Sequence, residues 1–138
     1  MSGLEAFLHP ISLEEKKEVV ISNRFRDADG NPVPFRIKSI SQEENEAITK
    51  RCRKVRKVDG RKEEYFDGLE YNRRLIVACT EYPDFSDAQL CSGYGVMDPL
   101  MVPAKMLLGG EYAALLSAIS ELCGFNQMAV EQAEEVKN

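Results

Sequence analysis

The sequence predicts an α+β fold that is mainly α-helical, with an N-terminal β-hairpin packed on about five helices. Two short segments rich in β-branched or alternating apolar residues lie near the N-terminus and flank turn-forming dipeptides. Later segments place apolar residues at helical spacing, and Ser, Asp, Gly and Pro stand where helices begin and end. The 138 residues fit one domain, 1–138, which is long enough to bury a core without disulfides or metal.

The hairpin is predicted from residues 16–25 and 35–40, preceded by an irregular arm over residues 1–15. The first segment has a run of three β-branched residues, and the second alternates apolar with polar or basic side chains. Turn dipeptides lie between them, and two strands alone are only marginally stable, so their apolar face must pack on helices or a partner. The arm is expected to dock through Leu4, Phe7 and Leu8. The basic side chains of the ribbon either protect its edge from aggregation or let it accept a strand from a partner: Arg24, Arg26, Arg36 and Lys38.

A helix is expected to begin at Ser41, because Ser41-Gln-Glu-Glu44 is a capping box. Acidic residues in its first turns and basic residues towards its end suit the helix dipole, so we extend it to Lys57. Residues 58–66 are then expected to form a mobile loop.

The remaining helices are predicted from apolar stripes at helical spacing. Pro83 is expected to stop one of them, and Gly124 is expected to cap the C-terminus of another. The first of them has the widest apolar arc and is expected to be the central buried helix, with Leu69 in its inward line. Gly109-Gly110 is expected to break the chain before the helix with the clearest stripe. The expected ranges are 69–81, 87–91, 103–108 and 111–123, followed by an acidic C-terminal helix at 127–138 that is mobile.

Composition excludes several classes of protein. The longest apolar stretches are only a few residues, so no transmembrane helix is expected, and the N-terminus lacks the basic start and apolar run of a signal peptide. The cysteines contain no CxxC pair, which argues against a disulfide scaffold or zinc ribbon and for small core residues in a reducing compartment. They are Cys52, Cys79, Cys91 and Cys123.

The sequence predicts no catalytic, cofactor or metal site. His9 is the sole histidine and lies in the arm, away from any nucleophile motif. Neither GxGxxG nor GxxxxGK[ST] occurs. The acidic turn at 27–31 has the wrong ligand order for a calcium loop, and no glutamate follows at loop position 12.

A basic segment is the most conspicuous charge feature. Residues 1–74 contain 16 Lys/Arg and 14 Asp/Glu, whereas residues 75–138 contain 2 and 9. Three interpretations stay open: a solvated helix end, a surface that binds an acidic protein or the acidic half of another copy in a homo-oligomer, and a phosphate-binding stripe of a nucleic-acid regulator. The absence of interleaved aromatic residues makes nucleic acid the weakest of the three. The segment holds Lys50, Arg51, Arg53, Lys54, Arg56, Lys57, Arg61 and Lys62.

Three stretches resemble the XkdN-like phage tail assembly chaperones. They are VVISNRFRDADGNPVPFRIKSISQEENEAITKRC (19–52), YNRRLIVACTEYPDFSDAQLCSGYGV (71–96) and KMLLGGEYAALLSAISELCGFN (105–126). The similarity runs from about Leu4 to Asn126 in the same order and spacing. It implies a non-enzymatic α+β protein of a long-tailed phage or prophage, which works in the cytoplasm of the bacterial host and is absent from the mature virion. The implied partners are the tape measure protein, which the chaperone keeps soluble, and the tail tube protein, which it recruits.

A chaperone of an extended helical client needs surfaces that are apolar at the centre and charged at the rim, and many weak contacts. The candidates are the small-residue face of the helix at 111–123, the Met/Leu segment 97–108 and the acidic final helix. The competing interpretation is that the methionines fill the core. The candidate partner-binding residues are Ala114, Ser117, Ala118, Glu121, Met97, Met101 and Met106.

Overall fold

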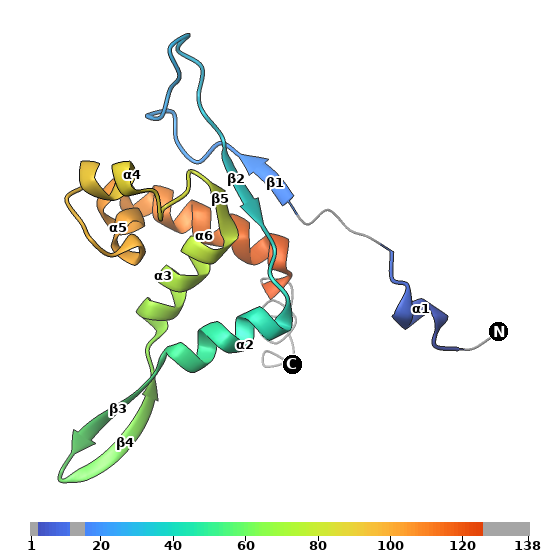
Figure 1. The fold of residues 1–138 in the computed structure, drawn as a ribbon, viewed down its shortest axis with the longest axis vertical. Coiled ribbons are helices and arrows are strands. Elements are labelled where there is room, and N and C mark those ends of the chain that lie inside the picture. Colours follow the sequence, from blue (N-terminus) through green and yellow to red (C-terminus); the bar gives the residue numbers. More distant parts are fainter. Residues whose placement is uncertain (1–2, 12–15, 126–138) are drawn as a thin grey trace, which may run out of the picture.

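A computed structural model describes residues 3–11 and 16–125 and shows helices and antiparallel strands, an α+β fold (Figure 1). A three-stranded sheet and the longer helices form the body, and a separate two-stranded hairpin projects from it. The strands are β1 (Lys16–Val19), β2 (Phe35–Lys38), β3 (Arg53–Val58), β4 (Arg61–Phe66) and β5 (Thr80–Tyr82). The helices are α1 (Glu5–Leu8), α2 (Gln42–Arg51), α3 (Gly68–Cys79), α4 (Ala88–Gly93), the 3-10 helix η1 (Pro99–Met101), α5 (Val102–Met106) and α6 (Gly109–Cys123).

The three-stranded sheet has β2 in its centre. β2 pairs antiparallel with β1 on one side, where Val19 lies opposite Phe35, and with β5 on the other, where Ile37 lies opposite Thr80. Because successive side chains of a strand point to opposite faces, Phe35 and Ile37 face the core while Arg36 is exposed. Arg36 and Lys38 therefore lie on the central strand, so the prediction that they form an open edge is wrong. The other two basic residues of the predicted ribbon, Arg24 and Arg26, lie in the connection from β1 to β2.

The core is built where α3 and α6 pack on this sheet, with α5 packed against α3. Ile76 on α3 and Leu115 and Ile119 on α6 have no exposed surface, and they form one cluster with Phe35 and Ile37 of β2. Burying such aliphatic and aromatic side chains stabilises a fold by about 1.5–3 kcal/mol each. The body is therefore held by contacts between segments that are distant in sequence.

The basic segment is divided between a helix end and a hairpin. Ser41 caps α2 as predicted, with its Oγ accepting from the amide of Glu44 at 3.2 Å. The helix ends at Arg51, however, and β3 and β4 follow, so the predicted continuation to Lys57 and the predicted mobile loop 58–66 are both wrong. The physical reason is the dipeptide Asp59-Gly60, whose φ values of 52° and 79° make the two-residue turn that matches the twist of a hairpin.

Two other boundaries differ from the prediction, and one agrees with it. The helix expected over 69–81 ends at Cys79, because Thr80 joins the sheet opposite Ile37. Gly109 and Gly110 are the first residues of α6 and do not break the chain before it. Gly124 does end α6, with φ 83°, as predicted.

The N-terminal arm contains the single helical turn α1 and stands apart from the body (Figure 1). Leu4, Phe7 and Leu8, which were expected to dock, are 62%, 81% and 66% exposed. The predicted C-terminal helix at 127–138 lies outside the described residues.

Candidate functional site

The candidate functional features of the described residues are surfaces. Within 3–11 and 16–125, no group of three or more His, Cys, Asp or Glu residues is placed to hold a metal ion. The four cysteines are free thiols; Cys52, Cys79 and Cys91 are buried, and Cys123 is half-buried. Burial raises the pKa of Cys52 and of Cys79, and Cys123 beside Cys79 raises the pKa of Cys79 further. A protonated thiol is a poor nucleophile, so these two side chains serve packing. No helix in the described ranges has the length and apolar content to cross a membrane.

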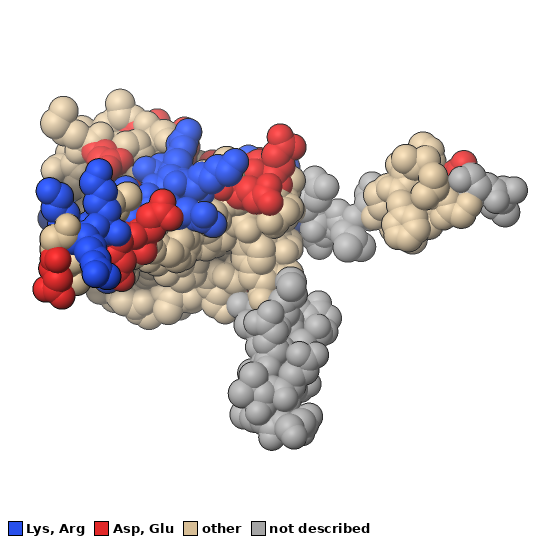
Figure 2. Space-filling view, turned by 90° about the horizontal axis from the view of Figure 1, so that it is seen from below, with Lys and Arg blue, Asp and Glu red and all other residues tan. Residues whose placement is uncertain are grey.

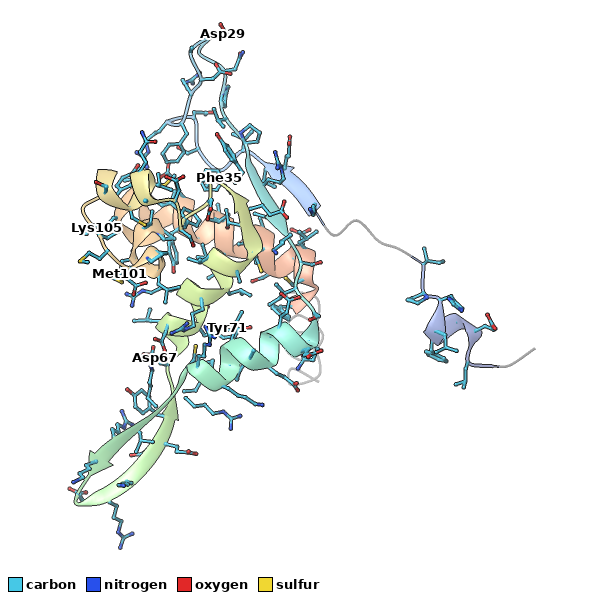
Figure 3. The ribbon with its side chains drawn as sticks, in the orientation of Figure 1. Asp29, Phe35, Asp67, Tyr71, Met101 and Lys105 are labelled. Carbon is cyan, nitrogen blue, oxygen red and sulfur yellow. The ribbon has the colours of Figure 1, made fainter. Side chains whose placement is uncertain are left out.

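The root of the β3–β4 hairpin is firmly attached to the body. The amide of Asp67 donates to the carbonyl oxygen of Cys52 at 2.8 Å, which closes the hairpin where α3 begins. Phe66 packs against Tyr71 with ring centroids 5.6 Å apart, and the Tyr71 hydroxyl donates to the side-chain carbonyl of Asn45 on α2 (Figure 3). The hairpin is thus a projecting ribbon whose base is held by α2 and α3.

Two cations in the half of the hairpin near the root, Lys54 and Arg56, are neutralised by carboxylates, whereas Arg53, opposite Phe66, has no carboxylate within ion-pair distance among the described residues. Lys54 Nζ lies 2.9 Å from Glu70 Oε2, and this hydrogen bond raises the pKa of Lys54 and lowers that of Glu70. Arg56 lies 3.6 Å from Glu63 and over the ring of Tyr65, 4.8 Å from its centroid. These two cations are already engaged within the chain.

Cations near the tip of the hairpin are not neutralised in this way. Lys57 lies directly opposite Lys62, and Arg61 lies opposite Val58. In the described part of the chain, Lys57, Arg61 and Lys62 have no carboxylate within ion-pair distance. Like charges placed opposite each other destabilise a ribbon, so the facing pair Lys57 and Lys62 is unfavourable; Asp59 in the turn is the acidic residue between them in sequence. Figure 2, seen from the hairpin end, shows Lys and Arg gathered on that side of the molecule.

The structure also places the other predicted partner-binding residues. Ala114, Ser117 and Glu121 are exposed on α6, while Ala118 is half-buried against the core. Met97 is 99% exposed and Met101 is half-buried. Figure 3 shows Met101 beside α5. The predicted set is Ala114, Ser117, Ala118, Glu121, Met97, Met101 and Met106, and it falls on one helix face and on the segment that precedes α6.

Met106 belongs to the core. Only 8% of its surface is exposed, and it packs in the cluster that contains Leu115 and Ile119. The interpretation of the methionines as core residues therefore holds for Met106, which a partner cannot reach.

Two hollows were missed by sequence reasoning. The first, about 360 Å³, lies between α2 and α3, with Ala47, Ile48, Val77, Ala78 and Leu100 as its apolar lining and Glu44, Arg51 and Arg74 as its charged lining. The second, about 460 Å³, lies where β5 leads into α4 and is lined by Tyr82, Pro83, Asp84, Asp87, Gln89, Leu90, Gly93 and Tyr94. The first is assembled from segments that are distant in sequence, so no local pattern predicts it. The second is lined by residues within 82–94, where no sequence motif marks a binding site.

Comparisons with known proteins agree with these observations. A family model described as phage XkdN-like tail assembly chaperone protein matches residues 4–137. Two Bacillus subtilis (strain 168) proteins are similar over 126 residues, covering 90% of this chain and 85% of each relative: the uncharacterized protein YqbN at 36% identity and the phage-like element PBSX protein XkdN at 35%. The crystal structure of YqbN matches this fold with a TM-score of 0.74 at 31% identity, covering 91% of this chain and 98% of that one. The chain therefore belongs to the XkdN-like family of phage tail assembly chaperones.

Proposed function

We propose that this protein binds the tape measure protein of its phage or prophage and keeps it soluble while the tail is assembled. In this proposal it also recruits tail tube subunits, acts in the cytoplasm of the host cell, catalyses no reaction and is absent from the finished virion. The observation that carries the proposal is the match to the tail assembly chaperone family over residues 4–137.

Two surfaces suit a long helical client. The exposed face of α6 carries Ala114 and Ser117, and small side chains let the axis of a second helix approach closely. The α2–α3 hollow has an apolar lining and charged side chains beside it, the arrangement that receives the apolar stripe of an amphipathic helix. Several weak contacts of this kind, repeated along the client by many copies, hold it through avidity.

The test is capture of this chain by an affinity-tagged tape measure protein from the same phage, with both proteins co-expressed. Ala114→Arg places a long charged side chain on the α6 face, and Ala47→Arg places one across the α2–α3 hollow; both positions are exposed, and Arg keeps helix propensity. We expect capture to fall several-fold for the variant whose surface is used, while Ala28→Arg, in the exposed turn between β1 and β2, is captured like the wild type. Full capture of both helix variants would refute both surfaces, and no capture of the wild type would refute the proposal itself.

A further inference from the structure

We propose that the free edge of strand β3 binds an extended acidic segment of a partner protein, which adds to the β3–β4 hairpin as a third strand. We call this surface the β3 edge and define it by Arg53, Val55 and Lys57. The partner segment carries an acidic, an apolar and an acidic side chain at alternate positions. This contact goes beyond the binding of the client, because the surfaces proposed for the client are the α6 face and the α2–α3 hollow.

The hairpin projects from the body with both of its long edges unpaired (Figure 1). In the described part of the chain its two strands pair only with each other, and all of their residues except Lys54 are exposed. The register runs from Arg53 opposite Phe66 to Val58 opposite Arg61 without a shift, and β3 contains no proline. A regular strand without a bulge or a proline is the kind of edge that accepts another strand.

The backbone groups of the β3 edge point away from β4. In an antiparallel pair, residues that exchange hydrogen bonds across the ladder alternate with residues whose amide and carbonyl groups point outward. Cys52 and Asp67 belong to the first kind, because the Asp67 amide donates to the Cys52 carbonyl oxygen at 2.8 Å. Counting from there, the outward positions of β3 are Arg53, Val55 and Lys57. Among the described residues, no hydrogen bond outside the ladder engages these backbone groups.

The side chains at the same three positions specify the partner. They share one face of the hairpin, because alternate residues of a strand point the same way. Val55 is 60% exposed, and neither Arg53 nor Lys57 has a carboxylate within ion-pair distance in the described ranges. An added strand places its side chains directly beside these, so acidic, apolar and acidic residues in that order are complementary. A carboxylate beside Lys57 also offsets the repulsion between Lys57 and Lys62.

Two other occupants fit this edge less well. The same hairpin of a second copy would place basic side chains beside basic side chains, and such repulsion is how charged edges avoid pairing with their own kind. A nucleic acid backbone supplies phosphate oxygens, which are acceptors only. The β3 edge alternates amide donors with carbonyl acceptors, and an extended peptide satisfies both.

The experiment titrates the full chain against fluorescently labelled peptides and measures fluorescence anisotropy. The matching peptide is TETVTET, in which threonine favours an extended chain. The peptide TTEEVTT has the same composition and charge without the alternation, and TKTVTKT has the alternation with reversed charge. We expect TETVTET to bind the wild type at least ~10-fold more tightly than either of the other two.

A charge reversal tests the complementarity. The variant R53E/K57E should bind TETVTET at least ~10-fold more weakly than the wild type does and should bind TKTVTKT more tightly. The control K17E/R36E reverses one lysine and one arginine at exposed positions of the three-stranded sheet, and it should bind TETVTET like the wild type.

A pair of proline variants tests whether the peptide adds as a strand. Val55→Pro removes the outward amide at the centre of the β3 edge and no hydrogen bond of the ladder, which is where an edge strand tolerates proline. Glu64→Pro is the matched control, because Glu64 lies directly opposite Val55 and its amide points out from the edge of β4. We expect TETVTET to bind Val55→Pro at least ~10-fold more weakly and Glu64→Pro no more weakly than the wild type.

Amide hydrogen exchange locates the new hydrogen bonds. In the free protein the amides of Val55 and Lys57 should exchange faster than that of Arg56, and saturating TETVTET should slow the first two. Slow exchange of Arg56 in Val55→Pro shows that the hairpin still forms. If that variant loses the hairpin, the charge reversal decides the proposal.

Equal binding of TETVTET and TTEEVTT would refute the alternating pattern, and unprotected amides at Val55 and Lys57 in the complex would refute strand addition. Loss of binding in K17E/R36E and not in R53E/K57E would place the contact on the other sheet and overturn the proposal. Binding of duplex DNA that R53E/K57E abolishes, without binding of TETVTET, would assign this edge to nucleic acid and would equally overturn it. The client-capture experiment uses none of these variants, so its failure and the failure of this proposal are distinguishable.

Discussion

Leu75 and Leu69 lie on the same helix and provide a matched test of how α3 packs. Leu75 is 2% exposed within the core cluster, whereas Leu69 is 69% exposed in the first turn. Replacing Leu75 by Ala removes three buried carbon atoms and leaves a cavity, which costs about 2–5 kcal/mol in the free energy of unfolding. Replacing Leu69 by Ala removes the same atoms from a largely solvated site and should change that free energy by about 0.5 kcal/mol or less.

Urea unfolding followed by far-ultraviolet circular dichroism measures both effects. With a urea dependence of about 1–3 kcal/mol per molar, Leu75→Ala should lower the midpoint by about 1–3 M and Leu69→Ala by a few tenths at most. The slope of the transition should stay the same in both variants. If Leu69→Ala destabilised the protein as much as Leu75→Ala, the first turn of α3 would have to pack in the core, as helical periodicity predicts. That result would refute the exposed position of Leu69 and the path of the chain from the hairpin into α3.

Three further predictions concern local features. Gly60→Ala places a side chain at φ 79°, a backbone conformation that favours glycine, so amide hydrogen exchange in β3 and β4 should accelerate. The global urea midpoint should change little, because the hairpin projects from the core, and a large loss of global stability would contradict this. Ser41→Ala removes the cap of α2 and should lower the free energy of unfolding by about 1 kcal/mol in urea titrations, whereas Ser41→Asp should restore it; equal stability of all three proteins would contradict the cap. The Arg24 guanidinium, with the Ser22 side chain and the Leu108 amide, lowers the pKa of Glu111 to about 2, so the folded state favours the carboxylate. Its stabilising effect is present above the unfolded-state pKa, about 4.3, and is lost as pH falls towards 2, so the melting temperatures of the wild type and Glu111→Gln should converge over that interval; a gap that stays constant with pH would refute this.

Two local signals in the sequence predicted helix ends correctly. Ser41 and Gly124 act within one turn of the helix that they cap, so their effect does not depend on the rest of the fold. The α+β class followed from the same kind of information, because strand and helix periodicities are visible in short windows.

Other features were predicted poorly, one of them despite a local signal and the others because they depend on distant partners. Val55 continues the helical stripe of α2 in sequence, but the adjacent turn at Asp59-Gly60 pairs β3 with β4 and places Val55 in a strand. Thr80 leaves the helical pattern because Ile37, far away in the chain, offers it a sheet edge. Leu69 fits the inward line of α3 yet is exposed, since the core begins only further along that helix.

The candidate sites also combine features that the sequence shows with features that only the fold reveals. The sequence identified the basic side chains and the small residues of α6, because clustering and spacing are local properties. It could not separate the two neutralised cations, Lys54 and Arg56, from the unpaired ones, since Glu70 and Glu63 reach them only through the fold. The hollow where β5 leads into α4 is lined by residues that all lie within 82–94, and it was missed because no residue pattern in that stretch marks a binding site.

The most direct test of the proposed function is the soluble fraction of the tape measure protein expressed with and without this chain. We predict that the client is largely insoluble alone, becomes soluble on co-expression and elutes from size exclusion together with several copies of this protein. A client that stays insoluble while both proteins are well expressed, with nothing eluting beside it, would contradict the chaperone function proposed for this chain.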